Sequence, residues 1–219
     1  IIKLATNPLI KGFTTNPTLM RKAGIQDYKA FALDILTEIK TLPISFEVFS
    51  DEFDEMYDQA LEINSWGLNT YVKIPITNTR GESSIPLIKR LTEVGIKVNA
   101  TAIFTLDQVF ETAQTLKDSH ESVISIFAGR IADTGRDPMP MMQAAVNMCY
   151  DINHRIEVLR ASPRELLNIL QAEQVGCHII TVPPDILSKM SSLNKDLTQF
   201  SLETVKMFYK DAQAAGYKI

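Results

Sequence analysis

The sequence has little of what disulfides, metal sites and membrane spans require. Its 219 residues include two cysteines and three histidines, and Cys149 and Cys177 form no CxxC or zinc-ligand spacing. We therefore expect no structural disulfide, and a reducing, cytoplasmic setting fits best. No apolar run reaches the roughly 18 residues that a membrane helix needs, and no signal peptide is recognisable.

The chain also lacks a basic run or a basic face. Its formal net charge is −4, which gives no reason to expect binding to nucleic acid or to a membrane surface. Hydrophobic residues make up 45% of the sequence, enough for a sizeable core in one globular unit. We expect a single barrel domain over residues 1–219, with a C-terminal helix at about 201–216 that Ser201 caps.

Short β-rich runs alternate with amphipathic helical segments along the whole chain. The runs cover residues 12–17, 44–49, 70–76, 97–104, 123–129, 155–162 and 178–184. Alternation of this kind predicts a parallel sheet with helices outside it, in either a doubly wound or a barrel arrangement. The chain opens with a helix-like segment, IIKLATNPL, and a closed barrel needs eight strands. We therefore predict an α/β fold, a (β/α)8 TIM barrel, whose first strand lies upstream of Ile1 or is missing from this sequence.

A lysine stands in the middle of the apolar run TYVKIPI. Strand side chains alternate in direction, so Val72 and Ile74 are expected to face the helices and Lys73 to face the barrel interior. Desolvation disfavours an ammonium group, and a neutral amine can form a Schiff base with a carbonyl. The alternative is a structural ion pair with Glu47 on the neighbouring strand, although such a pair is a poor way to stabilise a core.

Polar residues recur on the inner faces of other strands. They are Thr14 and Asn16, Ser45 and Glu47, Asn99 and Thr101 (which share a face with Ile103), and Ser125 (with Phe127). One such residue is usually a hydrogen-bonded core group. Polar groups at the carboxyl ends of strand after strand are instead the layout of a barrel active site.

Two arginines and a serine follow consecutive late strands. Arg130, Ser162 and Arg164 combine a planar guanidinium fork with a hydroxyl at a helix start, and both features suit a phosphate group. Each residue alone is more simply a solvated charge or an N-cap. Because barrel phosphate sites lie in this late-strand region, the three together predict phosphate binding.

Five ordered segments resemble motifs of the transaldolase family, in particular its small-subunit transaldolase and fructose-6-phosphate aldolase branch. They are GFTTNPT, YVKIP, NATAIF, SIFAGRI and ASPR. The resemblance implies that Lys73 is the Schiff-base nucleophile. It also implies that Asn99, Thr101, Ser125 and Phe127 line the site, that Asn16 and Asn99 hold dihydroxyacetone hydroxyls, and that Arg130, Ser162 and Arg164 bind phosphate.

Two positions refine the resemblance. Glu47 stands where transaldolases carry Glu and the aldolase group carries Gln, and Phe127 stands where the aldolase group has Tyr. In transaldolases this Glu holds the catalytic water with the counterpart of Thr101, so both choices favour transfer over simple cleavage. The sequence departs from the family at Pro163, usually Phe, and has no counterpart of the Asp in the family's first strand.

The function implied is transfer of a dihydroxyacetone unit from fructose 6-phosphate or sedoheptulose 7-phosphate to an aldose phosphate, as in the pentose phosphate pathway. Protein groups suffice for this chemistry, so no metal or organic cofactor is expected. The implied partners are sugar phosphates and further copies of the chain, in a pentamer or decamer. The alternatives are a fructose-6-phosphate aldolase that releases free dihydroxyacetone, and a non-catalytic phosphosugar-binding barrel.

Overall fold

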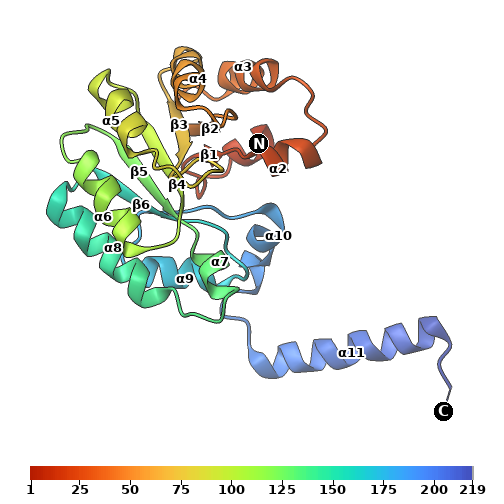
Figure 1. The fold of residues 1–219 in the computed structure, drawn as a ribbon. Helices are drawn as coiled ribbons and strands as arrows, with labels where there is room; N and C mark the ends of the chain where they lie inside the picture. Colours follow the sequence, from red (N-terminus) through yellow and green to blue (C-terminus); the bar gives the residue numbers. More distant parts are fainter. Residues whose placement is uncertain (219) are drawn as a thin grey trace. The chain divides into compact units, whose positions relative to one another are not determined.

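The computed structural model describes residues 1–218, which fall into two compact units. The first unit, Ile1–Val182, contains the whole sheet and helices α1 to α9 (Figure 1). The second unit begins at Pro183 and is helical.

The sheet has seven strands, and every pair of neighbours is parallel. The strands are β1 (Phe13–Thr14), β2 (Ile44–Glu47), β3 (Thr70–Pro75), β4 (Val98–Ile103), β5 (Ser122–Ile126), β6 (Ile156–Arg160) and β7 (Ile179–Ile180). Each strand lies beside the next one in the sequence, in the order β1 to β7. A doubly wound sheet would reverse this order at a switch point. The order of these seven parallel strands is that of a (β/α)8 barrel, which confirms the predicted fold class.

Helix α1 (Ile2–Ala5) precedes β1, and the helices after it connect successive strands. These connecting helices are α2 (Pro17–Lys22), α3 (Tyr28–Glu38), α4 (Phe53–Ser65), α5 (Ile85–Glu93), α6 (Leu106–Thr115), α7 (Ala128–Ala132), α8 (Met139–Ile152) and α9 (Leu167–Gln174). Figure 1 shows α4, α5, α6 and α8 along the outside of the sheet. This placement leaves the inner face of the strands free for other side chains.

The apolar core lies between the sheet and these helices. Its fully buried strand residues include Ile44, Phe46, Val72, Ile74 and Val98. They occupy alternate positions, as the period of two predicts, and each such side chain contributes about 1.5–3 kcal/mol through burial. A smaller cluster of Val123, Leu159 and Ala161 is separate from it.

Each observed strand is shorter than the run that predicts it, and the first and last are reduced to two residues. The run 12–17 contributes only Phe13–Thr14 to the sheet, and 178–184 only Ile179–Ile180. In the first case the strand ends because Asn16 caps α2: its Oδ1 accepts a hydrogen bond from the backbone N–H of Leu19, and Pro17 follows at the first helical position.

The second unit contains α10 (Pro184–Leu187), a 3-10 turn (Ser188–Ser192) and α11 (Leu197–Ala215). Helix α11 is capped by Asp196, whose side chain accepts from the N–H of Gln199, so the expected cap at Ser201 is wrong. The prediction placed the cap too late because it passed over the acidic residue before Leu197.

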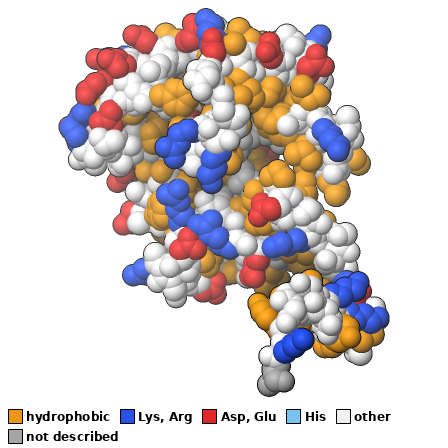
Figure 2. Space-filling view, turned by 90° about the vertical axis from the view of Figure 1, so that its right-hand side faces the viewer, with side chains coloured by type: hydrophobic (Ala, Val, Ile, Leu, Met, Phe, Trp, Pro, Cys, Tyr) orange, Lys and Arg blue, Asp and Glu red, His pale blue; other side chains and the backbone are white. Residues whose placement is uncertain are grey.

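Within the second unit, helix α11 has no buried residue. Its exposed large apolar side chains are Leu197, Phe200, Leu202, Val205, Met207, Phe208 and Tyr209. In Figure 2 hydrophobic side chains lie among Lys and Arg side chains on the molecular surface. Across residues 1–218, no helix is both long enough and apolar enough to cross a membrane.

Candidate active site

Lys73 and Glu47 form an ion pair on the inner face of the sheet. The register of β2 and β3 places the two residues side by side, and Lys73 Nζ lies 2.9 Å from Glu47 Oε2. Nζ also donates to the backbone carbonyl of Thr15 at 3.0 Å. Lys73 is 7% exposed, between the fully buried Val72 and Ile74. The alternation along the strand therefore buries the lysine on the inner face of the sheet, while Val72 and Ile74 belong to the core between the sheet and the helices.

A chain of hydrogen bonds crosses the interior next to this pair. Ser125 Oγ donates to Asn99 Oδ1 at 2.7 Å, and Asn99 Nδ2 donates to Ser45 Oγ at 3.0 Å. All three residues are buried, and Asn99 pairs with Lys73 in the β3–β4 register. The chain fixes the direction of the Asn99 amide beside the lysine. The two predicted site residues Asn99 and Ser125 are thus brought together, and Ser45 joins them.

Thr101 sits beside a distortion of β4. The β4–β5 register shifts between Ala100 and Ile103, and Ala102 has φ of 60°, a left-handed conformation that is strained for a residue with a Cβ. Because of this bulge, Ile103 belongs to the outer apolar core and does not share the inner face, contrary to expectation. Thr101 Oγ1 is buried without a hydrogen-bond partner among residues 1–218, so this hydroxyl is available to a ligand or a water.

The start of α7 presses against the segment that follows β6. The N–H of Gly129 donates to the carbonyl of Ala161 at 3.3 Å, and a Cβ on Gly129 would lie 1.5 Å from the carbonyl oxygen of Ser162. Only glycine fits there. Ser162 itself has φ of 60°. This close approach joins the two chain segments that carry Arg130 and Ser162.

The two arginines at this end have different partners. Arg164 Nε donates to Asp133 Oδ1 at 3.0 Å, and Nη2 contacts Oδ2, so the fork is bidentate. The Arg164 guanidinium lowers the pKa of the Asp133 carboxyl below its ordinary value, with a smaller contribution from Arg130. The Arg130 guanidinium lies 5.3 Å from the centre of the Phe127 ring. Sequence reasoning missed Asp133, because an acidic residue just after a short helix gives no local signal of a partner 31 residues away.

The remaining predicted residues lie on β1 and its exit. Thr14 pairs with Ser45 in the sheet and is half-buried. Asn16 Oδ1 accepts the hydrogen bond that caps α2.

Sequence reasoning also missed Thr15 and Tyr28. The Tyr28 hydroxyl lies 2.8 Å from Thr15 Oγ1 and accepts from the N–H of Glu47 at 3.0 Å. Helical periodicity places Tyr28 on the apolar face of its helix and carries no signal for its hydroxyl.

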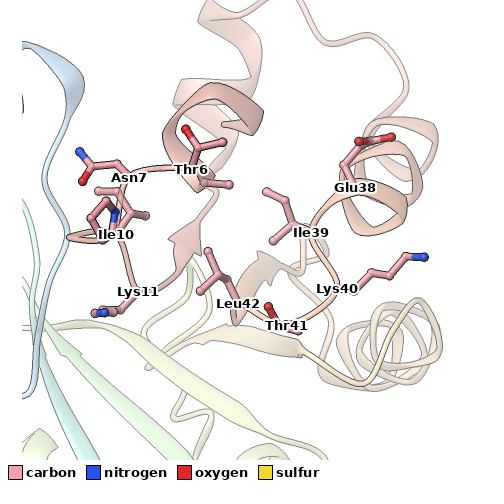
Figure 3. Close-up of a pocket in the computed structure, with 11 residues that line it drawn as sticks. Thr6, Asn7, Ile10, Lys11, Glu38, Ile39, Lys40, Thr41 and Leu42 are labelled. Atoms are coloured by element: carbon pink, nitrogen blue, oxygen red, sulfur yellow. The ribbon is translucent and has the colours of Figure 1, made fainter.

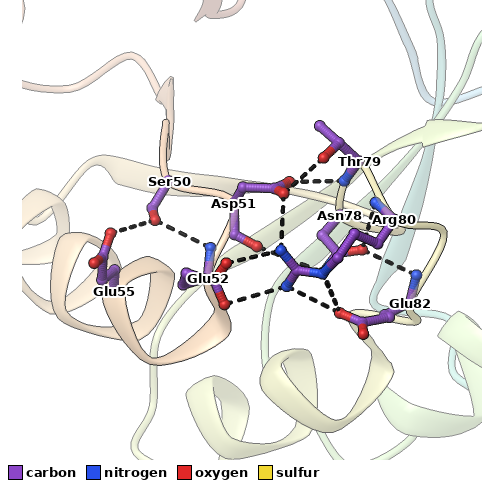
Figure 4. A network of polar contacts seen from close by, with 8 residues as sticks. All are labelled: Ser50, Asp51, Glu52, Glu55, Asn78, Thr79, Arg80 and Glu82. Carbon is purple, nitrogen blue, oxygen red and sulfur yellow. Dashed lines mark hydrogen bonds and ion pairs between the residues drawn. The ribbon is translucent and has the colours of Figure 1, made fainter.

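A polar network ties two loops together above β2 and β3 (Figure 4). Arg80, in the loop after β3, forms ion pairs with Asp51 and Glu52 in the loop after β2. Both loops leave the carboxyl ends of the strands that carry Glu47 and Lys73. The network therefore fixes the rim on the side of the lysine.

A cavity lies at the opposite ends of the strands, away from Lys73. It has a volume of about 350 Å³ and is lined by residues from the segments that precede β1 and β2, including Lys11, Glu38 and Leu42 (Figure 3). This is the amino-terminal end of the strands, whereas the predicted site residues lie towards the carboxyl ends. None of them lines this cavity.

The fold and this arrangement define a (β/α)-barrel protein with a polar interior at the carboxyl ends of its strands. Barrel enzymes carry their active sites at that end. The family described as Transaldolase/Fructose-6-phosphate aldolase matches residues 1–219, and the chain belongs to this family.

Curated relatives agree with this membership. A protein named "Probable transaldolase" from Dehalococcoides mccartyi is 34% identical over 182 residues, which cover 83% of this chain and 81% of the relative. Relatives with the same name from Nitrosopumilus maritimus and from a Thermoanaerobacter species are each 33% identical. They cover 93% and 96% of this chain, and 85% and 91% of the relatives. The resemblance inferred from the five motifs is confirmed.

Proposed function

We propose that this protein is a transaldolase that transfers a dihydroxyacetone unit through a Schiff base on Lys73. The observation that carries the proposal is the position of the Lys73 amine, which is desolvated on the inner face of the barrel and in contact with Glu47. Family membership supports the reaction class.

In the proposed reaction, the Lys73 amine attacks the C2 carbonyl of a ketose phosphate such as fructose 6-phosphate or sedoheptulose 7-phosphate. Loss of water gives an iminium, which accepts electrons as the C3–C4 bond breaks and the C4 hydroxyl gives up its proton. An aldose phosphate leaves, and a three-carbon enamine stays on the lysine. The enamine adds to the aldehyde of a second aldose phosphate, and water then hydrolyses the iminium.

Glu47 would move protons in this cycle. Its Oε2 is within hydrogen-bond distance of Nζ and can accept the proton that the lysine must lose before it attacks. The unpartnered hydroxyl of Thr101 supports a role in holding the water that Glu47 activates. Asn16, Asn99 and the nearby Thr14, Ser125 and Phe127 would shape the space for the dihydroxyacetone unit.

The phosphate would bind at the end formed by Arg130, Ser162 and Arg164. The close approach of Gly129 to Ser162 joins the segments that carry them. In this proposal Arg164 exchanges the carboxylate of Asp133 for a phosphate oxygen, which suits the same bidentate geometry.

A further part of the proposal concerns assembly. Helix α11 exposes its apolar side chains and has no buried residue within the second unit, which supports packing against another copy in a cytoplasmic pentamer or decamer. Sedimentation of the full chain against a variant that stops before Asp196 tests this point.

Borohydride trapping tests the reaction. The protein is reduced in the presence of fructose 6-phosphate, weighed intact by mass spectrometry and mapped by peptide digestion. A reduced three-carbon adduct on the Lys73 peptide is expected. Lys97→Met, which removes the lysine directly before the next strand, is the matched control and should trap the adduct equally. A folded protein with no adduct would leave a binding barrel with a structural ion pair.

Product analysis separates transfer from release. With an aldose phosphate acceptor present, a transaldolase forms a new ketose phosphate, and without acceptor it forms little free dihydroxyacetone. Equal release of dihydroxyacetone in both cases would instead identify a fructose-6-phosphate aldolase.

A further inference from the structure

The hydroxyl of Tyr28 lies behind the Lys73–Glu47 pair, on the helix side of the sheet. Tyr28 is the first residue of α3, and its ring packs edge-on against Phe46 and Trp66 with ring centres 6.0 and 6.1 Å away. This apolar packing holds the ring without using the hydroxyl. The hydroxyl reaches the carboxyl ends of β1 and β2, where it meets Thr15 and Glu47.

The direction of each hydrogen bond around this hydroxyl follows from the donors available. Thr15 Oγ1 has one proton, which it donates to the carbonyl of Ser45 at 3.0 Å. In the 2.8 Å contact between the two hydroxyls, Tyr28 must therefore be the donor. The Tyr28 oxygen in turn accepts from the N–H of Glu47 at 3.0 Å. Burial raises the pKa of the Tyr28 phenol above its ordinary value, which keeps the donating proton in place.

These contacts replace one rung of the β1–β2 ladder. The N–H of Thr15 donates to the carbonyl of Ser45, and in a regular parallel ladder the next bond would run from the N–H of Glu47 back to the carbonyl of Thr15. Instead, the N–H of Glu47 donates to Tyr28, and the carbonyl of Thr15 accepts from Lys73 Nζ at 3.0 Å. The phenol thus occupies the donor that would otherwise compete with the lysine.

Both contacts of the lysine amine therefore depend on one residue outside the barrel interior. Lys73 Nζ touches the carbonyl of Thr15 and the carboxylate of Glu47, and Tyr28 bonds to a second group of each of these residues. We propose that Tyr28 is a positioning residue for the Lys73 nucleophile: its hydroxyl takes the Glu47 N–H, which frees the Thr15 carbonyl to orient the amine. The inference rests on the proposed function of Lys73 and extends it.

Tyr28→Phe tests this inference, because it removes the hydroxyl and keeps the ring that packs on Phe46. The matched control is Tyr71→Phe, which also removes a phenol hydroxyl with a single side-chain partner: Tyr71 donates to Glu121 at 3.1 Å, from the strand of Lys73 itself. Both variants are made in the full chain and compared for kcat, KM, the rate of borohydride trapping with fructose 6-phosphate, and crystal structure.

In Tyr28→Phe we expect the missing hydrogen bond of the β1–β2 ladder to form. The N–H of Glu47 should bond to the carbonyl of Thr15, and Lys73 Nζ should lose its contact with that carbonyl. A misplacement of this size lowers kcat and the trapping rate by about 10- to 100-fold. KM should stay within about twofold, because the phosphate end is untouched. Tyr71→Phe should keep all four quantities near those of the wild type.

The outcomes separate the inference from the proposed function. If the wild type traps the adduct and Tyr28→Phe traps it at the same rate, with Lys73 still on Thr15, the inference is overturned and the function stands. If the wild type traps nothing, the function fails, and the position of Lys73 Nζ in the Tyr28→Phe crystal structure decides the inference alone.

A second variant covers the case in which Tyr28→Phe does not fold. Thr15→Val removes the hydroxyl that receives the Tyr28 proton and keeps the Thr15 carbonyl. It should lower kcat by a smaller factor with KM unchanged. An unchanged kcat in a folded Thr15→Val protein would show that the hydrogen bond from Tyr28 to the Thr15 hydroxyl does not help to position Lys73.

Discussion

The ion pair of Lys73 and the ion pair of Arg164 differ in how far their charged groups are exposed to water. Lys73 and Glu47 have side chains only 9% and 16% exposed, and hydrogen bonds to Thr15 and Tyr28 hold the two residues in place. Arg164 and Asp133 form an equally direct pair, but with about half of each side chain in water. The first arrangement suits a group that must react, and the second suits a group that must exchange one anion for another.

The two pairs also differ in what they contribute to stability. An exposed ion pair contributes little to stability, since water screens it. Removing one partner of a buried pair costs about 3–5 kcal/mol, because an uncompensated charge is left behind. Substitutions at the lysine should therefore affect both chemistry and stability, and those at Arg164 should affect mainly affinity.

The largest expected effect comes from Lys73→Met. Without the amine no Schiff base forms, and activity should fall by about 10⁴-fold or more. The unpaired Glu47 should also lower the melting temperature. Intact mass after borohydride treatment and a coupled activity assay measure the first effect, and calorimetry measures the second. Wild-type activity in the variant would show that the reaction does not need the buried Lys73 amine.

Glu47→Gln should have the next largest effect. The amide keeps the shape and a contact with Lys73 but cannot accept a proton, so kcat should fall by about 10²- to 10⁴-fold while the variant stays folded. The resemblance described above implies that the aldolase branch of the family carries Gln at this position. The residual products should therefore include a larger share of free dihydroxyacetone. Chromatography of the products with and without acceptor checks this. An unchanged product ratio would show that Glu47 does not decide between transfer and release.

Changes at the exposed pair should act on KM. Arg164→Gln should raise the KM for phosphorylated substrates by about 10- to 100-fold, the equivalent of one charge-assisted hydrogen bond. Asp133→Asn should change it in the opposite direction, by a few-fold, because Arg164 is no longer held by a carboxylate. Steady-state kinetics with glyceraldehyde in place of its phosphate provide the control, for which both variants should match the wild type. Equal effects on both acceptors would contradict a phosphate site at this end.

The smallest expected effect is on the titration of Asp133. Its pKa is lowered chiefly by the hydrogen bond from Arg164, so Arg164→Gln should return it towards the ordinary value of 3.8. Because the folded value lies below the unfolded one, the pair stabilises the fold above pH 3.8, and this contribution is lost as the pH falls through the lower folded value. A carbon-detected NMR titration of the Asp133 carboxyl measures the shift. An identical titration in both proteins would show that the pair does not persist in solution.

Local patterns in the sequence were sufficient for much of this description. Alternation along β3 predicted that Val72 and Ile74 face the helices and that Lys73 faces inward, since neighbouring side chains of a strand point to opposite sides. The regular succession of strand-like and helix-like segments predicted the parallel barrel order. The motifs GFTTNPT, YVKIP and SIFAGRI predicted the family.

Other features depended on which segments meet in space. The bulge at Ala102 turned Ile103 to the outer core, although the residue types there suit a regular strand. Arg164 meets Asp133, 31 residues away, and Lys73 meets the carbonyl of Thr15, 58 residues away.

By itself, then, the sequence determined the fold class, the family and the inward direction of Lys73, because each follows from a period or a motif within a few residues. Only the tertiary structure decided the partners of the buried groups. Tyr28 shows the reason: its ring obeys the helical period, but its hydroxyl bonds to whichever donors and acceptors the sheet register places beside it.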